Sequence, residues 1–207
     1  MYVDRGSPED AREMAKLYCQ AFPESVEFFF GRKSAKLLLD LMELTFRLIF
    51  HWGGEALLLK DEGGQAVGYC LYLSAEQARL QRRWGKALTC LARLAAKVAP
   101  SELLRLLHNQ LTMARSAEST RKIPKTKAEI LSIAISPACQ GQGLGTLLLE
   151  KVLQRIKNQP VILNVRANNE SGKRLYAAAG FSAYGTTKDL LGEWIMLIRE
   201  PRSHSQR

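Results

Sequence analysis

The feature that most constrains the fold of this chain lies between residues 130 and 165. Residues 130–135 form an almost continuous apolar run of strand length, typical of a strand covered on both faces. After Pro137 a helix is predicted, because leucine, valine and isoleucine recur at helical spacing from Leu144 to Ile156. A second strand is predicted over 161–165. A strand, a helix and a strand joined so closely form a crossover unit, so we predict an α/β fold in which these two strands are parallel.

The remaining elements are predicted from helical or alternating spacing of apolar residues. Ser7-Pro8 starts a first helix that runs to about residue 21, and Ser34 caps a second, amphipathic one. Between them, Pro23 and Gly31 are predicted to bracket a loop. Further predicted elements are a strand over 1–4, a hairpin over 55–60 and 66–73, a helix over 171–179, and apolar segments at 181–184 and 193–198.

The composition changes between residues 76 and 127. This stretch shows no strand pattern, and Pro100-Ser101 splits its helical rhythm into two helices. It carries twelve Lys and Arg against three Glu, so nearly all of the net charge of +10 lies here. A solvated outer face and a docking face for an acidic partner are both open interpretations. The 207 residues suit one compact domain, 1–207, with this stretch as a basic helical insertion.

Several classes of protein are disfavoured. The four cysteines show no C-x-x-C spacing and the three histidines lie far apart, so we expect no metal site. The N-terminus does not resemble a secretory signal, which indicates a cytoplasmic protein with free thiols. The most apolar region, 37–50, contains charges and is too short to span a bilayer, so no membrane partner is expected.

The segment between the buried strand and its helix predicts the chemistry. Its glycines allow a ligand to approach the backbone closely, and the first amides of the following helix have no helical partner, so the segment can bind phosphate. It lacks the lysine of a Walker loop and the third glycine of a dinucleotide fingerprint. A plain tight turn is the alternative. The segment reads Gln140, Gly141, Gln142, Gly143, Leu144, Gly145, Thr146.

These residues occur with two further motifs in a fixed order. Gln140-x-x-Gly143-x-Gly145 is followed by Asn169 and then by Leu175-Tyr176-x-x-x-Gly180-Phe181. Over residues 129–181 this pattern resembles the core of the GNAT superfamily of acyl-CoA-dependent N-acetyltransferases. The resemblance implies a central mixed sheet whose two parallel strands splay apart, flanked by helices. The helical stretch 76–127 departs from the family, in which the chain usually passes quickly to the strand before the glycine loop.

The resemblance also implies a binding mode for acetyl-CoA. The pantetheine arm would lie between the splayed strands against backbone groups of Ile133 and Ile135, with the diphosphate on the amides from Gln140 to Thr146. Asn169 resembles the position that contacts the cofactor arm. An N-cap role for Asn169, or a contact through Asn168 instead, remains open.

Catalytic roles follow from the same resemblance. Tyr176 matches the general acid that protonates the departing thiolate, and a core tyrosine is the alternative. Glu129 precedes the glycine-loop glutamine by eleven residues, as the base does in histone-type members. Strict alternation places it on the face of Leu131 and Ile133, unless a bulge redirects it. A solvated strand start, with the amine losing its proton to water, is the alternative.

Other residues near these motifs carry weaker hypotheses. Cys139 adjoins the loop and would suit a ping-pong scheme, although no histidine is near it. Lys173 and Arg174 could reach the 3′-phosphate of CoA or remain solvated. The acceptor is expected over 23–31 and 186–193, where Phe28, Phe29 and Phe30 would form an apolar wall and Glu24 and Glu27 would attract a cationic amine.

The sequence thus predicts an N-acetyltransferase that moves an acetyl group from acetyl-CoA to a primary amine by direct attack in a ternary complex. The acceptor is an amine of a small molecule or of a protein, and a homodimer is left open. Two alternatives belong to other classes: a non-catalytic CoA-binding regulatory module, and a protein that holds nucleic acid with its basic helices. No motif of regularly alternating basic and aromatic residues supports nucleic-acid binding, which disfavours that alternative.

Overall fold

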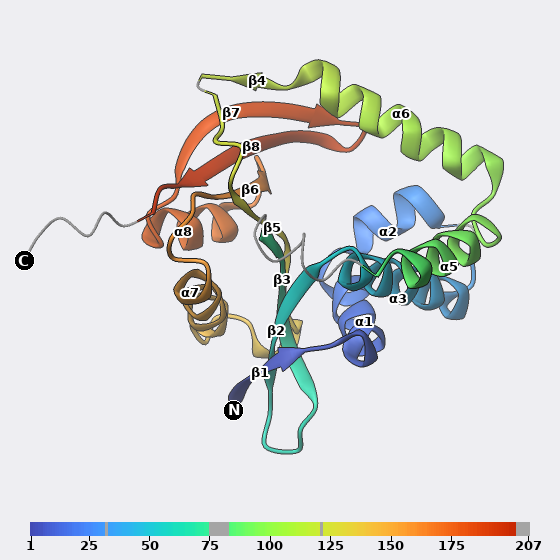
Figure 1. The fold of residues 1–207 in the computed structure, drawn as a ribbon, viewed down its shortest axis with the longest axis horizontal. Helices are drawn as coiled ribbons and strands as arrows, with labels where there is room; N and C mark the ends of the chain where they lie inside the picture. Colours follow the sequence, from blue (N-terminus) through green and yellow to red (C-terminus); the bar gives the residue numbers. More distant parts are fainter. Residues whose placement is uncertain (32, 75–82, 121, 202–207) are drawn as a thin grey trace, which may run out of the picture.

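A computed structural model of the chain describes residues 1–31, 33–74, 83–120 and 122–201. It has a mixed eight-stranded sheet in the order β1-β2-β3-β5-β6-β8-β7-β4, with helices on both faces (Figure 1). The α/β fold class expected from the sequence is therefore confirmed. The strands are β1 (Tyr2–Gly6), β2 (Gly54–Lys60), β3 (Ala66–Ser74), β4 (Glu118–Ser119), β5 (Ala128–Ile135), β6 (Val161–Arg166), β7 (Ser182–Asp189) and β8 (Gly192–Arg199). The helices are α1 (Ala11–Ala21), α2 (Pro23–Phe30), α3 (Ala35–His51), α5 (Trp84–Ala95), α6 (Pro100–Ser116), α7 (Leu144–Arg155) and α8 (Glu170–Ala178), with short 3-10 turns at Pro8–Asp10 and Pro137–Cys139.

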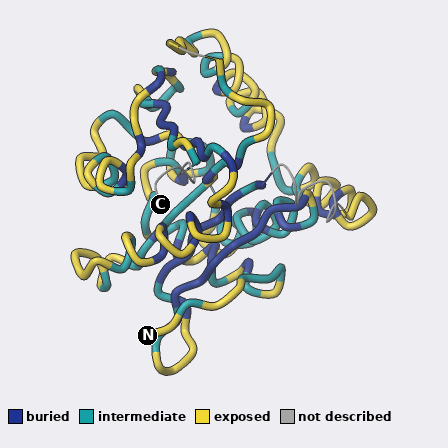
Figure 2. The backbone as a smooth tube through the Cα atoms, turned by 60° about the vertical axis from the view of Figure 1, so that its left-hand side comes forward, coloured by how far each residue is buried: buried dark blue, intermediate teal, exposed yellow. Residues whose placement is uncertain are grey.

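The two faces of the sheet have separate hydrophobic cores. On one face, α7 buries Leu148, Leu149 and Val152 against β3, β5 and β6. On the other, α1 buries Met14 and Ala15 with residues of α3, β2 and β3. Figure 2 shows the buried strands running through the centre of the molecule, with exposed residues along the outer helices. Burying apolar stripes on both faces explains why these central strands are apolar on both sides.

The centre of the sheet is open. β5 and β6 are parallel, as predicted, but only Ala128–Val161 and Glu129–Ile162 are paired. Beyond these two pairs the strands separate, while β5 continues along β3 and β6 along β8. The backbone edges that face each other across this gap are therefore left without a strand partner.

A β-bulge in β5 changes which face its residues occupy. Tyr72 of β3 pairs with Ile130 and Leu71 pairs with Ser132, so Leu131 is the extra residue. As a result Ile130 and Ile133 belong to the same core, the one beneath α7. Because neighbours in a strand alternate, Glu129 faces the opposite side from Ile133. The expectation from strict alternation was wrong, and the bulge is the reason.

Two other expectations differ from the structure. Residues 23–31, predicted as a loop, contain α2, because Pro23 occupies the first turn, where its missing N–H costs nothing, and the amide of Gly31 caps the end. The insertion forms α5 and α6, as predicted, but it also contributes β4, whose Glu118 and Ser119 pair with Thr186 and Gly185 of β7. Residues 76–82 and 121 of the insertion lie outside the described residues. No helix of the described residues, α5 and α6 included, is long and apolar enough to cross a bilayer.

Candidate functional site

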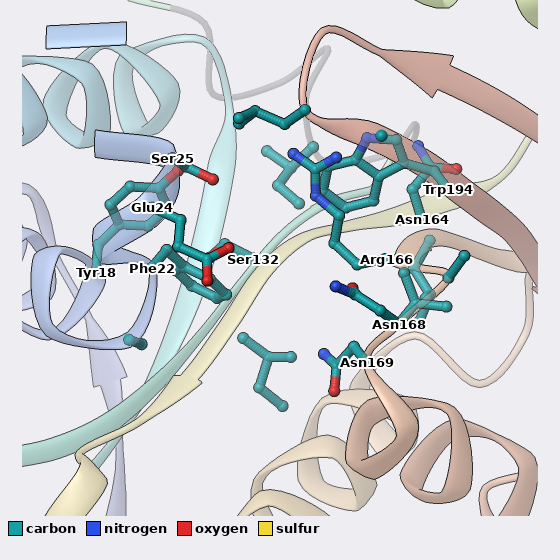
Figure 3. A pocket seen from close by; sticks show the side chains of 18 of the residues that line it. Tyr18, Phe22, Glu24, Ser25, Ser132, Asn164, Arg166, Asn168, Asn169 and Trp194 are labelled. Atoms are coloured by element: carbon teal, nitrogen blue, oxygen red, sulfur yellow. The ribbon is translucent and has the colours of Figure 1, made fainter. Parts of the chain in front are cut away.

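A cleft of about 790 Å³ lies where β5 and β6 separate. Its walls come from the junction of α1 and α2, from 130–133 of β5, and from 163–169 at the end of β6. Residues 191–194 at the start of β8 and Tyr176 of α8 complete the lining. Figure 3 shows Tyr18, Phe22 and Glu24 on one side and Arg166, Asn168 and Asn169 on the other. The separation of the two parallel strands thus creates a cleft between β5 and β6.

The edge of β5 presents backbone groups to this cleft. The amide of Ser136 donates to the carbonyl of Val67 at 2.8 Å, which makes Ser136 a hydrogen-bonded position of the β3–β5 ladder. In an antiparallel ladder such positions alternate, so Ile135 and Ile133 direct their N–H and C=O groups away from β3 and towards the gap. The Gln140 side chain donates from Nε2 to the Ile135 carbonyl at 3.0 Å. An extended ligand would therefore find both groups of Ile133 but only the amide of Ile135.

The glycine loop continues from the end of this edge. Gly141 and Gly143 have φ values of 77° and 75°, a left-handed conformation that glycine adopts without strain. A Cβ atom at either position would meet nothing within 4 Å. Leu144 starts α7, and the first helical hydrogen bond runs from the Leu147 amide to the Gly143 carbonyl. The amides of Leu144, Gly145 and Thr146 at the start of α7 are left without helical acceptors, an arrangement suited to an anion.

Tyr176 lies in α8 at the floor of the cleft. Its ring is buried and packs edge-on against Phe181, with the ring centroids 5.8 Å apart. Its hydroxyl has no hydrogen-bond partner in the described part of the chain. Burial raises the pKa of the phenol, so the hydroxyl keeps its proton at neutral pH. The residue thus combines a core ring with an unused proton donor.

Asn169 is the N-cap of α8. Its Oδ1 accepts from the Gly172 amide at 2.9 Å and from the Ser171 hydroxyl at 3.0 Å. The N-cap alternative is thus present, yet Asn169 also lines the cleft beside Asn168. Because the cap uses only the oxygen, the Nδ2 amide group remains for a ligand.

Glu129 lies at the vertex where the two strands meet, next to Ile162 of β6. It faces the side of the sheet opposite α7 and does not itself line the cleft, whose wall begins at Ile130. Burial raises the pKa of its carboxyl, an effect that nearby Lys127 partly offsets. Its role as a base stays a prediction.

The raised pKa of Glu129 makes stability depend on pH. Ionising a carboxyl whose folded pKa lies above 4.5 destabilises the folded state, fully so above the folded pKa and not at all well below 4.5. Glu129→Gln is therefore expected to raise the melting temperature at about pH 7.5 and to leave it unchanged near about pH 4. Thermal unfolding at both pH values measures this, with the exposed Glu150→Gln as the control. An equal change at both pH values would contradict the assignment.

Sequence reasoning missed a group at the end of β6. The Arg166 guanidinium donates two hydrogen bonds to Asp189, of 2.7 and 2.9 Å, and lies 4.0 Å from the centre of the Trp194 ring. Burial alone would raise the pKa of Asp189, but the hydrogen bonds from Arg166 keep it below its usual value. This pair fixes the β7–β8 turn against β6 at one wall of the cleft. The only signal in the sequence was an arginine at the end of an apolar strand.

The insertion supports the same turn. Asn109 of α6 accepts from the Leu190 amide at 2.9 Å, and Ser116 accepts from the Lys188 amide at 2.8 Å. Thr187 donates to the Met113 carbonyl at 2.7 Å. The described residues of the insertion therefore support one wall of the cleft and are not among those that line it.

The remaining candidates lie further from the cleft. Of the two acidic candidates, only Glu24 lines it, and the wall expected from Phe28, Phe29 and Phe30 is formed instead by Phe22 and Pro23. Lys173 pairs with Glu170 at 2.6 Å. Neither Arg174 nor the thiol-bearing Cys139 belongs to the cleft lining. Among the described residues, no group of three or more His, Cys, Asp or Glu side chains could hold a metal ion.

Comparisons with known proteins agree with this geometry. The family model described as "Acetyltransferase (GNAT) family" matches residues 13–181. N-alpha-acetyltransferase RimI of Mycobacterium tuberculosis is 34% identical over 64 residues, which cover 31% of this chain and 40% of that protein. The chain therefore matches well under half of the length of this relative.

Solved structures resemble the whole chain. An N-acetyltransferase from Staphylococcus aureus Mu50 superposes with a TM-score of 0.62 at 21% identity, covering 96% of this chain and all of that one. The ribosomal-protein-S18-alanine N-acetyltransferase from Escherichia coli superposes with a TM-score of 0.58 at 14% identity, covering 100% and 98% of the two chains. At these identities the solved structures support the fold alone. The family model matches most of the chain, and it shows that the chain belongs to the GNAT family of acetyltransferases.

Proposed function

We propose that this enzyme transfers an acetyl group from acetyl-CoA to a primary amine by direct attack in a ternary complex. One observation carries the proposal: the open edge of β5 leads along the cleft to a helix start whose amides are free to hold a diphosphate. Extended pantetheine can hydrogen-bond to the groups of Ile133 and the amide of Ile135 as an added strand does. The space beside Gly141 and Gly143 allows the phosphates to approach the backbone.

The chemistry then requires three events at the thioester. The neutral amine attacks the carbonyl carbon, the C–S bond breaks, and the departing thiolate takes a proton. Tyr176 supplies this proton through its otherwise unused hydroxyl, which its raised pKa keeps protonated at neutral pH. The proton lost by the amine passes to Glu129 or to water. If Glu129 is the base, Glu129→Gln moves the pH–rate profile to more alkaline values, and an unshifted profile rejects that role.

The acceptor is expected on the opposite side of the cleft from the glycine loop. This side is lined by Glu24 and by Glu193 at the start of β8. The acceptor is an amine of a small molecule or an amine of a protein. A peptide with an N-terminal alanine belongs in the test panel, since the similar protein from Escherichia coli is named for that substrate.

The experiment separates this proposal from its rivals. Acetyl-CoA and CoA are titrated by calorimetry, and release of free thiol is then followed with a panel of small amines, lysine peptides and N-terminal peptides. We expect saturable binding of both, and thiol release with at least one acceptor. Binding without release for every acceptor would favour a CoA-binding regulatory module. Salt-dependent binding of DNA or RNA without any affinity for CoA would favour the nucleic-acid alternative.

A further inference from the structure

A pair of hydroxyl groups connects the core beneath α1 with the cleft. The Tyr69 hydroxyl and Ser132 Oγ lie 2.8 Å apart. Tyr69 is fully buried, and its ring packs edge-on against Phe46. Ser132 follows the bulged Leu131 in β5 and lines the cleft (Figure 3). Neither hydroxyl has another hydrogen-bond partner among the described residues, so the pair joins the apolar interior to the candidate site alone.

The burial of Tyr69 decides which hydroxyl donates. If Ser132 donated, the phenolic proton would be left in an apolar core without an acceptor, and a buried unpaired donor is costly. The donor is therefore assigned as Tyr69, which keeps its proton because burial raises the pKa of its phenol. A serine oxygen that accepts one hydrogen bond still carries an O–H group and a second lone pair. In this arrangement the O–H group of Ser132 is left for a group in the cleft.

Packing alone does not require this pair. Tyr69→Phe would keep the ring contact with Phe46, and Ser132→Ala would remove only a hydroxyl. Replacing both partners of a buried hydrogen bond by apolar groups of the same shape costs little stability. As a donor, however, Ser132 gains from the arrangement, because hydrogen bonds in a chain polarise one another. A hydroxyl that accepts from Tyr69 is a stronger donor towards the cleft than an isolated serine would be.

The position of Ser132 along β5 matches the reactive end of acetyl-CoA in the proposed binding mode. With the diphosphate at the start of α7, the pantetheine arm meets Ile135 first and Ile133 next. The thioester, at the far end of the arm, then comes beside residues 130–132 of the cleft wall. Ser132 belongs to the face of the sheet covered by α1, and Tyr176 to the core beneath α7. The two hydroxyl groups thus approach the thioester from opposite faces of the sheet.

We infer that Ser132 is a catalytic residue that donates its hydroxyl hydrogen bond to the carbonyl oxygen of the thioester, and that Tyr69 is its positioning residue. When the amine nitrogen bonds to the carbonyl carbon, the π electron pair of the C=O bond moves to the oxygen, and it returns when the C–S bond breaks. A donor held in place stabilises the negative charge in between. Ser132 keeps its proton throughout. The inference rests on the proposed function and adds a donor for the oxyanion that the reaction forms.

Steady-state kinetics of four variants test the two roles. Ser132→Ala should lower kcat by about 10²-fold, as the loss of one oxyanion donor does, while the dissociation constant of acetyl-CoA stays nearly the same. Ser132→Thr keeps the hydroxyl and should restore most of the turnover. Tyr69→Phe should lower kcat by about tenfold or less, since Ser132 remains but loses its orientation. The double variant Tyr69→Phe/Ser132→Ala should be no slower than Ser132→Ala, because Tyr69 acts only through Ser132.

Infrared spectroscopy gives a readout that does not depend on turnover. Acetyl-CoA is isotope-labelled at the carbonyl carbon, and its C=O stretching frequency is measured free and bound without an acceptor. A hydrogen bond from Ser132 should lower the frequency, Ser132→Ala should return it towards the free value, and Tyr69→Phe should move it part of the way. Ser74→Ala is the matched control. Ser74 is buried, accepts from Gln159 Nε2 at 2.8 Å and does not line the cleft, so its loss should change neither the frequency nor kcat.

The outcomes separate this inference from the proposed function. If the unmodified chain binds no acetyl-CoA, or releases no thiol with any acceptor, both are overturned. If the unmodified chain turns over and Ser132→Ala keeps either its full kcat or the same carbonyl frequency, only the role of Ser132 is overturned. Melting curves of the double variant test packing: an unchanged melting temperature with a low kcat supports the inference, and a large fall in melting temperature would overturn it in favour of a structural pair.

Discussion

Gly143→Val is expected to weaken acetyl-CoA binding at least about a hundredfold. Gly143 has a φ of 75°, and a β-branched residue there either adopts a strained conformation or rotates the peptide groups that begin α7. In the strained conformation its side chain would also occupy the open space beside the loop that we assign to the phosphates. Calorimetric titration with acetyl-CoA measures the change in dissociation constant.

The chain offers a matched control for backbone strain. Gly64 has a φ of 79° in the hairpin between β2 and β3, and a Cβ there would meet only the Tyr2 hydroxyl, 3.9 Å away. Gly64→Val should lower stability by a similar amount, about 1–2 kcal/mol, while leaving the affinity for acetyl-CoA unchanged. If Gly143→Val binds acetyl-CoA as the unmodified chain does, the glycine loop is not part of the site.

Tyr176→Phe is expected to lower kcat by about 10² to 10⁴ while the dissociation constant of acetyl-CoA stays nearly the same. The substitution keeps the ring against Phe181 and removes only the hydroxyl, which has no other partner in the described residues. The thiolate would then leave without a positioned proton donor. Thiol release under saturating substrate, together with a binding titration, separates the two effects.

Tyr72→Phe is the control for this substitution. Tyr72 is another buried tyrosine of the same core, in β3, and it does not line the cleft. Removing the hydroxyl of Tyr72 should leave kcat unchanged. Normal turnover by Tyr176→Phe would reject the role of general acid, and a fall in turnover shared by Tyr72→Phe would point to a general loss of packing.

The parts of the site that depend on local backbone could be predicted from the sequence. The glycine loop is such a part, because the left-handed turns at Gly141 and Gly143 and the start of α7 need only neighbours along the chain. The parallel pairing of β5 and β6 follows from the crossover unit. Tyr176 was singled out by the resemblance to a family. The spacing of apolar residues alone would not have placed it at the cleft.

Other parts depend on contacts between distant segments. The bulge at Leu131 reverses the face of Glu129, yet an apolar run without alternation contains no sign of it. The pairing of Arg166 with Asp189 requires β8 to return beside β6, and the cleft wall at Phe22 requires α1 to pack on β3. The residues of α2 did carry a local signal that was overlooked, since Pro23 and Gly31 are the start and stop residues of a helix.

The insertion leaves the sheet at the end of β3 and returns at β5, and these two strands are immediate neighbours. Such a junction tolerates a long excursion, since the chain re-enters the sheet next to where it left. The excursion nevertheless reaches across to β7 through β4 and α6, far from the glycine loop. Recognition of the acyl donor and the shape of the acceptor side are thus encoded in separable lengths of chain, so that one can diversify during evolution while the other is kept.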